Sequence, residues 1–138
     1  MKNKKKKDKK NHIRVKREKY TIKVMIEMYC HAHHGTEKGK LCNECSRVLD
    51  YAIERIDYCA FGIKKPACET CPIHCFKKDM REQMRNIMRY AGPRMTWKYP
   101  ILAFMHIFDL LRGKKINRLY EKEANKPNFK FKMLLEKI

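Results

Sequence analysis

The chain has 138 residues, a length that suits one domain with a single hydrophobic core. Its formal net charge at pH 7 is +19. This charge is explained about equally well by contact with an anionic partner such as nucleic acid and by a lysine-rich surface that contacts only water. The longest apolar stretch, residues 100–111, is too short for a membrane-spanning helix, which needs about 20 residues.

Four helices are predicted, and they follow a lysine-rich segment over residues 1–12 that we expect to be a disordered tail. Apolar residues recur at helical spacing in residues 13–29, 43–58, 77–91 and 101–112. Gly92-Pro93 is expected to end the third helix, and Gly113 to follow the fourth. Because almost nothing alternates as a strand would, the sequence predicts a small all-α domain over residues 13–113. Residues 114–138 are a poorly specified extension.

All seven cysteines lie between residues 30 and 75, in two loops on either side of the second predicted helix. No apolar segment follows the N-terminal lysines, so we predict no secretory signal and a cytoplasmic, reducing location. In that compartment clustered cysteines are more often metal ligands than disulfides. The sequence therefore predicts two Cys/His metal-binding loops.

The later loop holds four cysteines within seventeen residues, namely Cys59, Cys68, Cys71 and Cys75. Four thiolates are soft donors that suit either zinc or a four-iron iron–sulfur cluster. Either centre would carry about −2 of charge, so charge does not distinguish zinc from iron. His74, between the last two cysteines, is more consistent with a hydrogen bond to a carbonyl than with metal binding, although an extra-ligand role stays open.

The earlier loop offers three cysteines and three histidines, namely Cys30, His31, His33, His34, Cys42 and Cys45. Cys42-x2-Cys45 opens the second helix, and Cys30-x3-His34 completes a set of three thiolates and one imidazole that is normal for structural zinc. His31 and His33 are then surplus. They are either hydrogen-bonding groups behind the ligands or ligands around an open coordination position, and we favour the first.

Enzymatic function is not favoured by the rest of the sequence. It contains no nucleophile elbow, P-loop, dinucleotide-binding glycine pattern or His-Glu-x-x-His motif, so no catalytic residue is predicted.

Basic and aromatic residues alternate around residues 88–100, where they suit contact with phosphates and bases. The candidates for nucleic-acid contact are Arg85, Arg89, Arg94, Trp97 and Lys98. A corner between two helices, with core aromatics and solvated arginines, explains the same pattern and is slightly favoured. The sequence assigns no oligomeric state.

Four segments of the chain resemble the nitrous oxide-stimulated promoter (YgbA-like) family of small bacterial proteins. These segments are MYCHAHHG (28–35), LCNEC (41–45), YAIERIDYCAFGIKKPACETCPIHC (51–75) and MRYAGPRMTWKYPILAFMHIFDLL (88–111). The resemblance covers about residues 17–111 and implies a cytoplasmic protein linked to nitric oxide or nitrosative stress. Nitric oxide attacks iron–sulfur clusters and thiolate-bound metals, so we expect a metal-binding stress-response protein. The alternative is a zinc-stabilised nucleic-acid-binding module.

Overall fold

The computed structural model describes residues 11–64, 66–68, 71–73, 75–128 and 130–131. Over these residues the chain forms four α-helices and one 3-10 turn, without any strand. The elements are α2 (Ile13–His34), α3 (Asn43–Asp57), η1 (Gly62–Lys64), α4 (Lys78–Lys98) and α5 (Pro100–Ala124). The predicted all-α fold of about four helices is confirmed.

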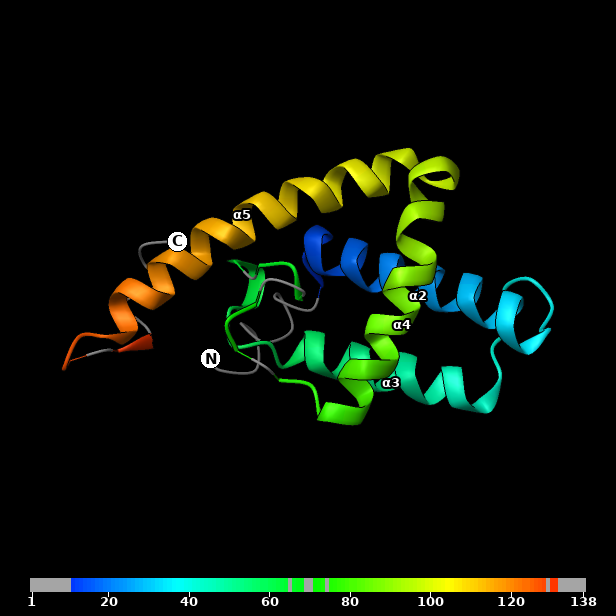
Figure 1. Cartoon of the computed structure of the whole chain (residues 1–138), viewed down its shortest axis with the longest axis horizontal. Coiled ribbons are helices and arrows are strands. Elements are labelled where there is room, and N and C mark those ends of the chain that lie inside the picture. The colour runs from blue at the N-terminus through cyan, green and yellow to red at the C-terminus, as the bar shows by residue number, and fades with distance from the viewer. Residues whose placement is uncertain (1–10, 65, 69–70, 74, 129, 132–138) are drawn as a thin grey trace.

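Helices α2 and α3 lie side by side, and α4 crosses them before the chain turns into α5 (Figure 1). The core fills the space between α2, α3 and α4, because each of them has an apolar stripe with helical spacing. Its buried members include Ile22, Ile26 and Cys30 from α2, Cys45, Val48, Ala52 and Ile56 from α3, and Met84, Ile87, Ala91 and Met95 from α4. Ala52 and Ala91 are completely buried in this core.

A second, smaller apolar cluster joins α5 to the segment between α3 and α4. Phe61 and Ile116 are its buried members, and Cys59 and Cys71 pack against them. Near the start of α2, Asp109 of α5 accepts hydrogen bonds from two arginines of that helix (2.9 and 2.8 Å). These contacts fasten α5 to the rest of the fold. None of the helices in the described part of the chain is long and apolar enough to cross a membrane.

The prediction that Gly92-Pro93 ends the third helix is wrong, because α4 continues to Lys98. A proline inside a helix costs roughly 3 kcal/mol, since it lacks the N–H that would bond to the preceding turn. The apolar stripe of α4 nevertheless continues past Pro93 to Met95, which is buried in the main core. Burial of Met95 offsets the local cost of the proline.

The prediction that the fourth helix stops before Gly113 is also wrong, since α5 extends to Ala124. Gly113 itself is buried, and Ile116 beyond it packs on Phe61 in the smaller apolar cluster. These tertiary contacts allow α5 to continue past Gly113, although a glycine would tend to end the helix if no other part of the chain packed against it. In the same way α2 runs on to His34, five residues beyond the expected end, and so carries Cys30 and the neighbouring histidines on a helix.

Candidate metal centre

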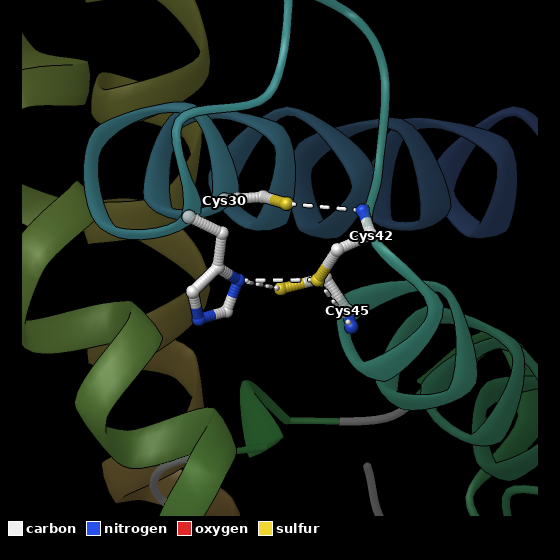
Figure 2. A group of neighbouring side chains, drawn as sticks. Cys30, Cys42 and Cys45 are labelled. Carbon is white, nitrogen blue, oxygen red and sulfur yellow. Dashed lines mark hydrogen bonds between the residues drawn. The ribbon is translucent and has the colours of Figure 1, made fainter.

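Three cysteines and one histidine meet where α2 ends and α3 begins (Figure 2). Cys30 and His34 are one turn apart at the end of α2, and Gly35 then reverses the chain with a left-handed φ of 64°. Cys42 is the N-cap of α3, and Cys45 lies in its first turn. The turn between the two helices therefore brings two ligand pairs together.

The ligand atoms of Cys30, His34, Cys42 and Cys45 all lie within 4.8 Å of one another. His34 Nδ1 is 3.1 Å from the sulfur of Cys42 and 3.4 Å from that of Cys45. A zinc tetrahedron with bonds of about 2.3 Å to sulfur has edges of about 3.8 Å, so the four atoms need to move little to surround an ion. The donor set and its spacing fit a tetrahedral metal.

Backbone and hydroxyl groups already point at the sulfur atoms of this cluster. The N–H of Cys42 and the hydroxyl of Thr36 donate to Cys30 Sγ over 3.2 and 3.3 Å, and the N–H of Cys45 donates to Cys42 Sγ over 3.4 Å. Donors of this kind stabilise thiolates and fix the orientation of metal ligands. The role of Thr36 could not be predicted from the sequence, because only the fold brings its hydroxyl back onto Cys30.

The thiols of the cluster differ in acidity. Burial raises the pKa of Cys30, but hydrogen bonds from Thr36 and Cys42 outweigh it, and the pKa is lowered overall. Burial, followed by the neighbouring sulfurs of Cys30 and Cys42, raises the pKa of Cys45. Three thiolates this close repel one another, and a cation among them would remove that penalty.

The two surplus histidines are turned toward carbonyls instead of the cluster. His31 Nδ1 contacts the carbonyl oxygen of Thr36, and His33 Nδ1 lies 3.1 Å from that of Tyr29. The ring of His33 also stacks on Tyr29 at 4.1 Å between centroids. Of the three histidines only His34 has a ring nitrogen among the sulfurs, so the geometry gives no support to an open coordination position.

The four cysteines of the later loop line a single cavity of about 420 Å³ between α3, α4 and the segment that joins them. Among the residues that the structure describes, the Cys30 group is the one set of three or more such ligands whose atoms all lie within 4.8 Å of one another, so the four later sulfurs are not gathered as closely. Cys68 Sγ donates to Glu18 over 3.7 Å. His74 lies outside the described residues.

The lining of this cavity also includes four arginines, which we call its cationic wall and which the sequence alone did not reveal. Its arginines are Arg55 from α3 and Arg81, Arg85 and Arg89 from α4. The three on α4 are spaced four residues apart and form one row, and no carboxylate of the described chain pairs with them. Arg55 bonds to Glu54 through its Nη2 atom, yet its buried Nε has no acceptor. A group of negative charge in the cavity would therefore be attracted by these arginines.

The five candidates for nucleic-acid contact are all exposed on α4, but they do not form one face. Arg85 and Arg89 face the cysteine cavity. Arg94 lies over the ring of Tyr90 at 3.8 Å and donates to that residue's carbonyl oxygen. At 3.6 residues per turn, Arg94, Trp97 and Lys98 lie a quarter to a half turn around the helix from the first two. Nucleic-acid contact stays a prediction.

Comparison with known proteins gives one family. Residues 13–121 match the family model described as "Nitrous oxide-stimulated promoter". Over 96 residues the chain is 44% identical to an Escherichia coli (strain K12) protein named "Uncharacterized protein YgbA", and the match covers 70% of this chain and 80% of that protein. No solved structure matches the chain.

Proposed function

The chain belongs to the nitrous oxide-stimulated promoter family, and from this premise we propose that it is a cytoplasmic metal-binding protein of the response to nitric oxide and nitrosative stress. One observation carries the metal-binding part of the proposal, namely the three thiols and one imidazole gathered within 4.8 Å. The stress-response part rests on the family and on the reactivity of thiolate-bound metals toward nitric oxide. A reducing compartment is required because the thiols must remain free to bind metal.

The first site is a structural zinc site whose ligands are Cys30, His34, Cys42 and Cys45. Four protein ligands leave no open position on a tetrahedral ion, as in other structural zinc sites. Two of the ligands belong to α2 and two to α3, so a bound ion would clamp the two helices together. Cys30 and Cys45 are also buried in the main core, which makes metal binding and folding parts of one equilibrium.

The second site is the cavity lined by Cys59, Cys68, Cys71 and Cys75, where we propose an iron–sulfur cluster, with zinc as the other candidate. Four thiolates around either centre leave about −2 of charge, and the cationic wall of Arg55, Arg81, Arg85 and Arg89 supplies charge of the opposite sign. Because this cavity is open to solvent and Cys75 is exposed, a small reactive molecule such as nitric oxide can reach the second site.

Metal analysis of protein purified without oxygen, from cells with ample iron, tests both sites. We expect one zinc per chain together with iron, sulfide and a brown colour that nitric oxide bleaches. Cys71→Ser should remove the iron and keep the zinc, and Cys42→Ser should remove the zinc. The two variants serve as controls for each other, since each changes one cysteine to serine in a different site.

The possible outcomes separate the proposals. Two zinc ions and no colour would exclude the iron–sulfur cluster and keep metal binding. Protein with neither metal would contradict the proposal as a whole. Retention of both metals in Cys71→Ser would show that the later cysteines are not ligands.

A nucleic-acid-binding role is the second candidate, and one observation favours it. Arg81, Arg85 and Arg89 form an exposed row that no carboxylate among the described residues pairs with, as a helix that contacts phosphates would. Binding to duplex DNA would then weaken steeply as salt is added. Absence of binding to DNA and RNA at low salt would eliminate this role.

A further inference from the structure

A stripe of large apolar side chains on the outer face of α5 is exposed. Ile101, Phe104, Ile107, Phe108 and Leu111 are 79%, 69%, 54%, 61% and 61% exposed, and Trp97, at the corner between α4 and α5, is 90% exposed. The other exposed large hydrophobic side chains in the described part of the chain, Ile13, Tyr20 and Tyr58, are single residues elsewhere. Single exposed hydrophobic residues are ordinary, whereas a contiguous stripe marks a binding surface.

The opposite face of α5 is already in contact with the rest of the molecule. Leu102, Ala103 and Leu110 line a cavity of about 310 Å³ shared with α2 and α4. Asp109 bonds to α2, and Ile116 is buried in the smaller apolar cluster. Helix α5 therefore has two apolar faces, and the described residues of the chain cover only one of them.

The size of the stripe matches what a stable dimer needs. A large side chain presents about 200 Å² when fully exposed, so the six residues offer roughly 800 Å² in total. One partner contributes about that area to a protein–protein interface of standard size. The stripe is larger than the few hundred Å² of contiguous apolar surface that monomeric proteins usually expose.

The order of residues in the stripe makes it complementary to itself. Ile101, Phe104, Phe108 and Leu111 follow one another at intervals of three, four and three residues, which is the spacing of helix–helix seams. The order of spacings and of side-chain sizes is the same from either end of the stripe, because aliphatic residues stand at its two ends and aromatic residues at its two central positions.

We propose that this face of α5 binds the same face of a second copy of the chain, with the two helices antiparallel about a two-fold axis. The axis lies near residue 106, between the two phenylalanines. Phe104 of each copy then packs on Phe108 of the other, and Ile101 packs on Leu111.

The charges around the stripe distinguish a second copy of the chain from an anionic partner. No charged side chain lies on the stripe, and the charges at its ends, Lys98 on one side and Lys114 and Lys115 on the other, are all cationic. An antiparallel pair brings these cationic ends near each other, so added salt should strengthen the dimer by screening their repulsion. Binding of an anionic membrane or of nucleic acid by the same surface would weaken with salt.

The first experiment measures the mass of the full chain in solution by sedimentation, from micromolar to about 0.5 mM protein, at low and high salt. The parent should shift from one chain to two as concentration rises. Phe104→Glu should weaken this dimer by at least roughly 30-fold, because it places a charge at the centre of the interface. Ile13→Glu is the matched control, since Ile13 is 78% exposed on another helix, and it should dimerise as the parent does. Trp97 is the only tryptophan of the chain, and its emission should shift to the blue as the dimer forms.

The second experiment tests the antiparallel arrangement by mixing two variants that each fail to dimerise. Phe104→Glu mixed with Phe108→Lys places the new carboxylate opposite the new ammonium group, while the second pair of phenylalanines remains intact. The mixture should therefore form a heterodimer. In a parallel pair the two charges would lie one helical turn apart along the seam, each facing a phenylalanine, and dimerisation would not return.

A parent that stays monomeric over the whole range overturns the proposal, as does a dimer that Phe104→Glu leaves unchanged. Salt-sensitive binding of the parent to anionic vesicles, abolished by Phe104→Glu and without any dimer, would assign the stripe to a membrane surface and also overturn it. Circular dichroism of Phe104→Glu should match that of the parent monomer, because the side chain is exposed in a single chain.

Discussion

Zinc should stabilise the fold through His34, and this can be tested by comparing two neighbouring histidines on one helix. His34 and His31 are both exposed near the end of α2, so alanine at either position removes little from the core. Only His34 has a ring nitrogen among the sulfur atoms, whereas His31 contacts the carbonyl oxygen of Thr36. His34→Ala should lose most of the stabilisation by zinc, and His31→Ala should retain it.

The magnitude follows from linkage between binding and folding. A metal that binds only the native state at a free concentration 1,000 times its Kd adds about 4.1 kcal/mol of stability. If loss of one ligand weakens binding about 100-fold, the added stability falls to roughly 1.4 kcal/mol. With an unfolding entropy of about 0.3 kcal/mol per kelvin for a chain of this length, zinc should raise the Tm of the parent by about 14 °C and that of His34→Ala by about 5 °C.

The assay is thermal unfolding followed by circular dichroism, with a chelator and with buffered zinc. The three proteins should unfold at nearly the same temperature in chelator, and the difference should emerge only when zinc is added. Two results would refute the reasoning. One is an equal rise in Tm for His34→Ala and the parent, and the other is an equal loss in His31→Ala.

Three further substitutions test the packing around these sites. Ile26→Ala, at a completely buried position in the main core, should lower the free energy of unfolding by about 3–4 kcal/mol in urea titrations, and a loss under 1 kcal/mol would mean that the core is not as described. Asp109→Asn should lower the free energy of unfolding by about 1–2 kcal/mol, because its arginine partners are mostly buried, and the loss should be smaller at high salt. Glu37→Gln is the control, because Glu37 is in an exposed ion pair, and it should change the free energy of unfolding almost not at all. Pro93→Ala should raise stability by about 1–3 kcal/mol in the same titrations, because it restores a donor inside α4, and an unchanged midpoint would show that the proline imposes no strain.

The first cluster was predictable because its geometry is local. Cys30 and His34 are four residues apart on one helix, and Cys42 and Cys45 form a cap and a first turn, so short-range rules already place each pair. Only eight residues connect the two helices, so the ligand pair at the end of α2 must lie close to the ligand pair at the start of α3. The orientation of His31 and His33 was left open, because it depends on carbonyls and on Tyr29.

The cationic wall could not be predicted, because it depends on contacts between distant parts of the chain. Arg81, Arg85 and Arg89 share one helix face, a pattern visible in the sequence, but nothing local indicates that this face looks onto cysteines. Arg55 joins them only through the packing of α3 near α4. The ends of α4 and α5 were mispredicted for the same reason. Buried contacts of Met95 and Ile116 outweigh the local signals of Pro93 and Gly113.

The two cysteine groups differ in burial, and this difference predicts different roles for them whichever metal they bind. In the first group Cys30 and Cys45 are part of the main core, so any change in their ligation is also a change in folding. In the second group Cys59, Cys68 and Cys71 are half-buried and Cys75 is exposed, around a cavity open to solvent. A reaction there disturbs first the smaller apolar cluster, because Cys59 and Cys71 pack against it together with Ile116 of α5. A chemical signal at the second group would therefore reach α5, the helix with the exposed apolar stripe, while a metal ion bound between α2 and α3 would hold the main core unchanged.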